Sequence, residues 1–202
     1  MIFLRYESFR GYLKMYPVTS VLIALNLLIF CGDAIFDHEL IIRGAFIDIP
    51  QDPFGLQEPW RYITSMFLHR DFAHLFYNMF ALLVFAPPLE NMLGSGRYAV
   101  FYLLSGLIAN AVSAVIVTHP TISVGASGAI YGIYGAYLYL AVMKKSLDEG
   151  SRKTVYVILV FGVIYSLIAE GINLWAHIGG ALAGFAMAYL YDQILIAKRR
   201  RS

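Results

Sequence analysis

The sequence predicts an all-α membrane protein with six transmembrane helices, and three observations support this fold class. Hydrophobic residues make up 59% of the 202 residues and charged residues only 14%, and the mean hydropathy is +0.66. Soluble globular domains carry roughly 25% charged residues. The apolar residues also fall into six long runs, and a spanning helix needs about 20 such residues. We therefore expect residues 1–202 to form a single membrane domain, with no room for a separate soluble domain.

The six expected spans follow one another with mostly short connections. The second should end at the pair Pro87-Pro88, because proline interrupts a helix. The fourth is barely long enough to cross the bilayer, so its first residues should lie below the membrane surface. The spans cover residues 16–36, 62–87, 97–117, 126–143, 154–169 and 175–197.

The longest polar stretch, residues 37–60, joins the first two spans and contains three prolines. Its scattered apolar residues predict a short amphipathic piece lying in the membrane interface. Trp60 and Arg61 end this stretch, as an aromatic anchor and a cation where the chain re-enters the bilayer.

The basic residues predict the orientation, because Lys and Arg gather on the cytoplasmic side of membrane proteins. With six spans, twelve of the 15 Lys and Arg residues fall on one side, and Arg43, Arg61 and Arg70 fall on the other. Both termini are thus predicted to be cytoplasmic, in a plasma or inner membrane. Because orientation in the lipid bilayer explains the positive charge, we expect no nucleic-acid partner. The twelve are Arg5, Arg10, Lys14, Arg97, Lys144, Lys145, Arg152, Lys153, Lys198, Arg199, Arg200 and Arg201.

The segment Gly125-Ala126-Ser127-Gly128 opens the fourth span. Small residues at this spacing allow a close approach to the backbone, which either another helix or a substrate could use. The tetrapeptide alone leaves both alternatives open.

Polar side chains within spans two, four and six indicate a site, because histidine, asparagine and serine facing lipid are costly. The predicted orientation places Ser127 and His177 at one depth in the outer leaflet, so His177 could take the serine proton as a base. His74 and Asn78 lie four residues apart on one helical face. Together with the backbone N–H of Ser127, they could stabilise an oxyanion.

These residues also have alternative interpretations. His177, His74 and Asn78 could simply bridge helices through hydrogen bonds. A zinc site would need His69, His74 and His177 together, but His69 and His74 diverge around a helix and no cysteine lies nearby. The zinc-protease motif His-Glu-x-x-His is also missing from the sequence. We therefore expect no metal and no cofactor.

The sequence resembles the rhomboid family of intramembrane serine proteases, of the minimal six-span bacterial type, over nearly its whole length. The family's Trp-Arg pair is matched by Trp60 and Arg61, its His-x4-His-x3-Asn by His69, His74 and Asn78, and its Glu-x3-Gly with a following basic residue by Glu90, Gly94 and Arg97. Its Gly-x-Ser-Gly is matched by Gly125, Ser127 and Gly128, and its Ala-His-x-x-Gly-x3-Gly by His177, Gly180 and Gly184.

The resemblance implies a Ser-His dyad, with Ser127 as nucleophile and His177 as general base and acid. It also implies that Tyr131 orients the imidazole by stacking, that His74, Asn78 and Gly125 support the oxyanion, and that the remaining matched residues are structural. The implied activity is cleavage of the transmembrane segments of membrane-protein substrates. Nothing in the sequence indicates the oligomeric state.

Two functions other than proteolysis are compatible with a membrane protein of this kind. A rhomboid-like protein could bind membrane proteins without cleaving them, but such proteins lack the serine or the histidine, and both are present here. A small transporter could relay protons through His177, but this function leaves Gly-x-Ser-Gly unexplained.

Overall fold

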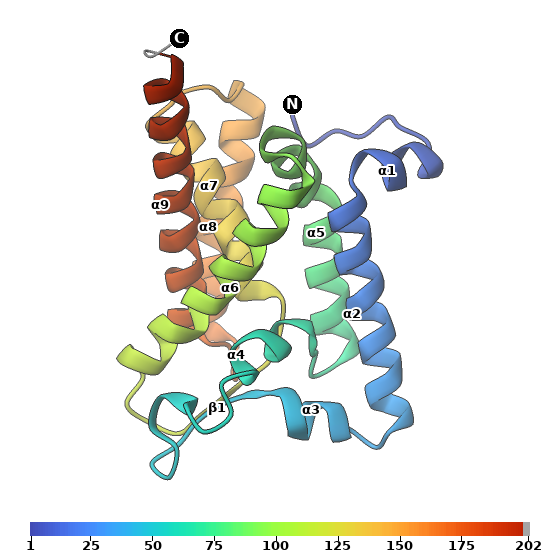
Figure 1. Cartoon of the computed structure of the whole chain (residues 1–202), viewed down its shortest axis with the longest axis vertical. Coiled ribbons are helices and arrows are strands. Elements are labelled where there is room, and N and C mark those ends of the chain that lie inside the picture. Colours follow the sequence, from blue (N-terminus) through green and yellow to red (C-terminus); the bar gives the residue numbers. More distant parts are fainter. Residues whose placement is uncertain (200–202) are drawn as a thin grey trace.

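In a computed structural model, residues 1–199 are described, with side chains described through residue 195. Within that range the chain is a bundle of helices with one short strand pair, and α1 lies at the same end of the bundle as the C-terminal end of α9 (Figure 1). Arg200 and Arg201, which count toward the predicted orientation, lie outside the described residues. The elements are α1 (Phe9–Met15), α2 (Pro17–Ile35), α3 (Glu39–Gly44), β1 (Phe46–Asp48), η1 (Pro53–Gly55), α4 (Arg61–Thr64), η2 (Ser65–Phe67), α5 (Phe72–Leu93), α6 (Ser95–Ile116), β2 (Thr121–Ser123), α7 (Ser127–Val142), α8 (Glu149–Ile168) and α9 (Leu174–Arg199).

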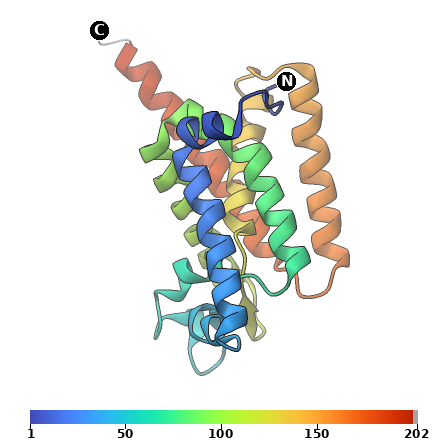
Figure 2. The same ribbon diagram turned by 90° about the vertical axis from the view of Figure 1, so that its right-hand side faces the viewer.

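The predicted fold class is confirmed, because α2, α5, α6, α8 and α9 are each long and apolar enough to cross a membrane. The remaining long element, α7, has 16 residues and is therefore about 24 Å long, shorter than the roughly 30 Å hydrocarbon core. It lies among α5, α6, α8 and α9 and packs against them (Figure 2). Most of its side chains are buried. Because its neighbours cover it, α7 completes the six-helix bundle without needing the full length of a lipid-facing span.

The expected second span, 62–87, was wrong at both ends. Helix α5 begins later, at Phe72, because Asp71 caps it by accepting a hydrogen bond from His74 N at 2.8 Å. It also continues through Pro87 and Pro88 to Leu93. A proline leaves the carbonyl four residues before it without its helical partner, and for Pro87 that is the Leu83 carbonyl. The hydroxyl of Tyr12 on α1 donates to this oxygen at 3.2 Å and so replaces the hydrogen bond that Pro87 removes.

The loop between α2 and α5 covers one end of the bundle. Helix α3 is a short helix in this loop and lies across the bundle end in Figure 1, while its location in the membrane interface stays a prediction. Strand β1 pairs antiparallel with β2, with Phe46 opposite Ser123 and Asp48 opposite Thr121. This pairing, which was not predicted from the sequence, ties the first loop to the segment that leads into α7.

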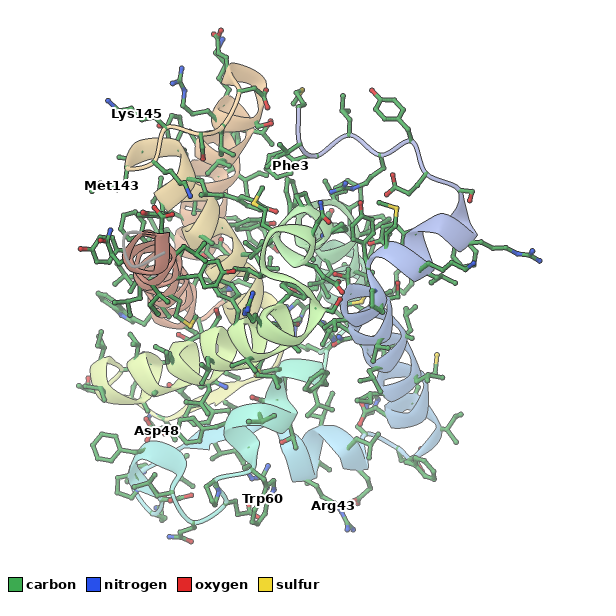
Figure 3. The ribbon with its side chains drawn as sticks, turned by 45° about the horizontal axis from the view of Figure 1, so that its top comes forward. Phe3, Arg43, Asp48, Trp60, Met143 and Lys145 are labelled. Carbon is green, nitrogen blue, oxygen red and sulfur yellow. The ribbon has the colours of Figure 1, made fainter. Side chains whose placement is uncertain are left out.

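The buried side chain of Arg61 holds the same loop through hydrogen bonds. It was expected to be a cation at the membrane surface, but it is only 7% exposed. Its Nη1 donates to the Ile42 and Ala45 carbonyls at 2.9 Å each, and Nη2 lies 2.6 Å from the Glu58 carboxylate. The expectation was wrong because three acceptors from the loop satisfy the guanidinium in the interior. Trp60 remains half-exposed at this end of the molecule, near Arg43 (Figure 3).

Glu90 joins three helices. Its buried carboxylate accepts hydrogen bonds from Val18 N, Thr19 N and Thr19 Oγ1 at 3.0, 2.8 and 2.7 Å, and from Ser95 Oγ at 2.7 Å. The first N–H groups of a helix have no partner inside the helix, and α2 has no side-chain cap of its own. The carboxylate at the end of α5 therefore caps α2 and also holds the first turn of α6.

Candidate active site

A tight turn places Ser127 at the first position of α7. Gly125 N donates to the Ser65 carbonyl at 2.9 Å, which anchors the turn to η2. Gly125 has a φ of +129°, a backbone conformation open mainly to glycine. A Cβ added at Gly125 would also lie 2.7 Å from Cε1 and Nε2 of His74 and 3.7 Å from Ser127 Oγ. Glycine is thus required at this position both by the backbone and by the neighbouring ring.

Helix α9 brings His177 to the serine, and His177 Nε2 lies 2.8 Å from Ser127 Oγ. Asn173 fixes the start of this helix, because its Oδ1 accepts a hydrogen bond from Ala176 N at 3.0 Å. The Asn173 amide also donates to Ser113 Oγ on α6 at 2.6 Å and to Ser123 Oγ on β2 at 2.9 Å. Asn173 therefore ties the start of α9, which carries the imidazole, to α6 and β2.

Glycines allow α7 and α9 to approach closely enough for this hydrogen bond. A Cβ added at Gly180 or Gly184 would overlap the backbone carbonyl of Gly128 or Gly132, respectively. On its other side, a Cβ at Gly128 would lie 2.7 Å from that of Ala109 on α6. Gly128 therefore packs against helices, as one alternative for the Gly-x-Ser-Gly segment predicted, while Ser127 lines a cavity and the approach of a substrate stays a prediction.

Two further side chains hold the imidazole of His177. The Tyr131 ring stacks on it, with centroids 4.1 Å apart and planes 7° apart. Ser166 Oγ on α8 lies 2.7 Å from His177 Nδ1. Gly162, one turn before Ser166, leaves room for the Tyr131 hydroxyl, which a Cβ there would overlap. The imidazole is thus fixed on one face and at both ring nitrogens.

His74 and Asn78 both lie on α5, and only His74 is in contact with the turn that holds the serine. The His74 ring lies beside Gly125, as the contacts of an added Cβ show. Asn78 is buried, but its Nδ2 donates along its own helix to the His74 carbonyl at 2.8 Å. The first turn of this helix is held by Asp71, and the pKa of that carboxyl is lowered by the hydrogen bond from His74 N and by the Arg70 side chain. His74 therefore lies close to the serine, whereas the Asn78 amide is directed into its helix.

His69, which also matches the family pattern, packs edge-on against the His74 ring with centroids 5.0 Å apart. The His177 ring stacks on Tyr131 and not on either of these two histidines. Across the described residues, no three His, Cys, Asp or Glu side chains are grouped so that they could hold a metal ion.

A cavity of about 30 Å³ adjoins Ser127 and His177. This volume has room for about two water molecules. Polar side chains line it together with small and apolar ones, and the polar ones include Asn110, Ser123 and Asn173. Asn110 Nδ2 donates to Ser65 Oγ at 3.0 Å and to the Tyr62 carbonyl at 2.9 Å, which fixes the cavity wall between α6 and η2.

The site also contains four polar residues that were not predicted from the sequence, namely Ser65, Asn110, Ser166 and Asn173. The criterion that selected Asn78, a polar side chain in an apolar helix, applies equally to Asn110 and Ser166. Asn173 carried a different signal, because asparagine is a preferred residue immediately before a helix.

Comparison with known proteins gives one consistent family. A family model described as a rhomboid domain matches residues 56–193. The putative rhomboid protease YdcA of Bacillus subtilis is 33% identical over 193 residues, which cover 95% of this chain and 97% of YdcA. The rhomboid protease GluP of the same bacterium is 36% identical over 84% of this chain, but this covers only 34% of GluP. RHOMBOID-like protein 6, mitochondrial, of Arabidopsis thaliana is 36% identical over 66% of this chain and 44% of that protein.

Proposed function

The chain belongs to the rhomboid family, and on this premise we propose that it is a serine endopeptidase that cleaves transmembrane segments of other membrane proteins. One observation carries the proposal, namely the 2.8 Å separation of Ser127 Oγ and His177 Nε2 inside the bundle. A serine becomes a useful nucleophile when a base lies within hydrogen-bond reach. The bacterial relatives that are named as proteases support the same chemistry.

In the proposed reaction, Ser127 Oγ attacks the carbonyl carbon of the scissile peptide while His177 Nε2 takes the hydroxyl proton. When the tetrahedral intermediate collapses, the C–N bond breaks and His177 returns this proton to the departing amine. A water then attacks the acyl-enzyme, and His177 acts as base once more. Stacking on Tyr131 keeps the imidazole in one orientation through both steps.

The oxyanion of the intermediate needs hydrogen-bond donors beside Ser127. The Ser127 N–H opens α7, and the first N–H groups of a helix have no partner within it. His74 lies next to the same turn. Asn78 becomes a third donor if its amide turns from the His74 carbonyl toward the substrate. Each donor of this kind contributes about 3 kcal/mol to transition-state stabilisation.

We place the protein in a plasma or inner membrane with both termini in the cytoplasm. Lys145 lies at the same end as Phe3, opposite the end that holds Asp48 and Trp60 (Figure 3). This arrangement supports the positive-inside assignment. Ser127 begins its short helix on the side of the first loop, so the catalytic residues lie toward the outer surface. Water reaches them from that side, and the adjacent polar cavity supports this route.

A fluorophosphonate probe tests the proposal on the full-length protein in detergent micelles. We expect covalent labelling of Ser127, loss of labelling in Ser127→Ala, and cleavage of a designed single-span substrate that Ser127→Ala no longer cuts. Ser105→Ala is the matched control and should keep both signals, because the Ser105 hydroxyl is buried on α6 beside Gly132 and has no hydrogen-bond partner among the described residues. A folded wild-type protein that is neither labelled nor active would contradict the proposal and favour a binding protein without protease activity.

A further inference from the structure

Ser166 contacts His177 on the side away from Ser127. It lies on α8, is 6% exposed, and its hydroxyl is 2.7 Å from both His177 Nδ1 and the Gly162 carbonyl oxygen. The Tyr131 hydroxyl also hydrogen-bonds to Ser166, and it can donate to the second lone pair of the serine oxygen. Other residues of α8, such as Phe161 and Leu167, are apolar and exposed. A polar side chain that lies in the apolar part of this helix and contacts the imidazole therefore calls for an explanation.

The two short distances fix the direction of every hydrogen bond around the imidazole. A carbonyl oxygen can only accept, so Ser166 uses its single hydroxyl hydrogen to donate to Gly162. A separation of 2.7 Å between Ser166 Oγ and His177 Nδ1 also requires a hydrogen between them. Since the hydroxyl hydrogen is already used, Nδ1 must carry it. His177 Nε2 is then unprotonated and accepts from the Ser127 hydroxyl.

We propose that Ser166 is a positioning residue that holds His177 in the Nδ1–H tautomer and aims Nε2 at Ser127. It would do what the aspartate does in a Ser-His-Asp triad, where a hydrogen bond to Nδ1–H sets the tautomer and the ring orientation. The inference rests on the proposed function and deepens it from a dyad to a chain of three directed hydrogen bonds. This chain runs from α7 through α9 to α8. The Nδ1–H bond persists when Nε2 takes the serine proton, so it also supports the imidazolium.

The surroundings explain why a hydroxyl can serve here in place of a carboxylate. A carboxylate buried between apolar helices carries a large desolvation cost. A serine brings no charge, and its bond to Gly162 satisfies the hydroxyl hydrogen within α8. The oxygen lone pairs of Ser166 remain available to accept from His177. The site thereby gains a fixed tautomer without burying a charge.

A purely structural role for Ser166 makes a different prediction. Serine hydroxyls in membrane helices often donate to the carbonyl four residues earlier, with no functional consequence. Ser20 on α2 does this, with its Oγ 2.8 Å from the Tyr16 carbonyl, and no hydrogen bond joins it to an imidazole. If the local bond were the whole role of Ser166, then Ser166→Ala and Ser20→Ala would have the same effect on turnover.

The kinetic test compares three variants of the full chain on a designed single-span substrate. We expect Ser166→Ala to lower kcat about tenfold with KM changed less than about twofold, as for loss of one neutral hydrogen bond in the transition state. Ser166→Thr keeps the hydroxyl and should restore kcat to within about threefold of wild type, while Ser20→Ala should match wild type. Equal kcat values for Ser166→Ala, Ser20→Ala and wild type would overturn the inference.

A spectroscopic test does not depend on activity. In protein with ¹⁵N-labelled histidine, the signals of His177, assigned with His177→Gln, should show a protonated Nδ1 and an unprotonated Nε2. Ser166→Ala should shift them toward the other tautomer or a mixture, while Ser166→Thr should not. A wild-type spectrum with the proton on Nε2 overturns the inference even if Ser166→Ala does not fold. Absence of labelling and cleavage in wild type would instead contradict the proposed function and leave this spectrum as the test of the hydrogen-bond chain.

Discussion

Replacing Gly125 with alanine should separate the geometry of the site from the stability of the fold. The new Cβ would lie 2.7 Å from His74 Cε1 and Nε2, whereas an ordinary contact begins at 3.4 Å, so the ring or the turn must shift by about 0.7 Å. The φ of +129° adds backbone strain, because alanine rarely adopts it. Both effects act beside Ser127, which lies two residues further along the chain.

The expected losses of kcat and of unfolding free energy follow from these two effects. A misplacement near 1 Å in a reacting site lowers the rate about 100-fold, so we expect kcat to fall by about that factor. The strained backbone costs about 1–3 kcal/mol of unfolding free energy. In a chain of this length each kcal/mol lowers Tm by about 2–4 °C.

Two other glycines provide matched controls for cleavage and for Tm in the same detergent. Gly94 has a φ of +77° but nothing within 4 Å of an added Cβ, so Gly94→Ala should lower Tm and leave kcat within about threefold. Gly96 lies in α6 with nothing within 4 Å and no positive φ, so Gly96→Ala should leave kcat unchanged and should not lower Tm. If Gly125→Ala turns over substrate as fast as Gly96→Ala, the reasoning about the turn and His74 is wrong.

Four further predictions concern the dyad, the oxyanion donors, the cleavage position and the packing. Ser127→Ala and His177→Ala should each abolish cleavage, and the double variant should lose little more, because the two residues act as one unit; strictly additive losses would refute the dyad. His74→Ala and Asn78→Ala should each lower kcat about ten- to a thousandfold while fluorophosphonate still labels Ser127; wild-type turnover in both would remove them from the oxyanion site. Mass spectrometry of the products should place the cut near the outer end of the substrate helix, at a small residue beside glycine or proline. Local unwinding must precede attack, and each polar group that unwinding frees in lipid costs several kcal/mol. Efficient cutting in the cytoplasmic half would contradict the predicted orientation. Glu90→Leu should destabilise the fold by about 2–4 kcal/mol, because it leaves the donors of Val18, Thr19 and Ser95 without their acceptor. Denaturant titration measures this loss, and an unchanged stability would show that other groups cap α2.

The sequence predicted the fold class and the common depth of Ser127 and His177 because both depend on local properties. Hydrophobicity and run length are read residue by residue, and span counting converts them into sides and depths of the membrane. The glycines of α7 and α9 likewise carried a packing signal that does not depend on which helix is the partner. From these properties the serine and the histidine could be assigned to one level of the bundle, though not to one hydrogen bond.

The tertiary structure decided the features whose partners come from distant parts of the chain. Pro87 was expected to end its helix, yet the Tyr12 hydroxyl satisfies the carbonyl that this proline frees. Arg61 was expected at the surface, yet carbonyls of the first loop draw it inside. The bond between Ser166 and His177 joins two helices whose relative rotation no local pattern records. A polar group inside a membrane protein must form a hydrogen bond with another group of the protein. The sequence shows that such a group is present, and the packing of the helices determines which residue becomes its partner.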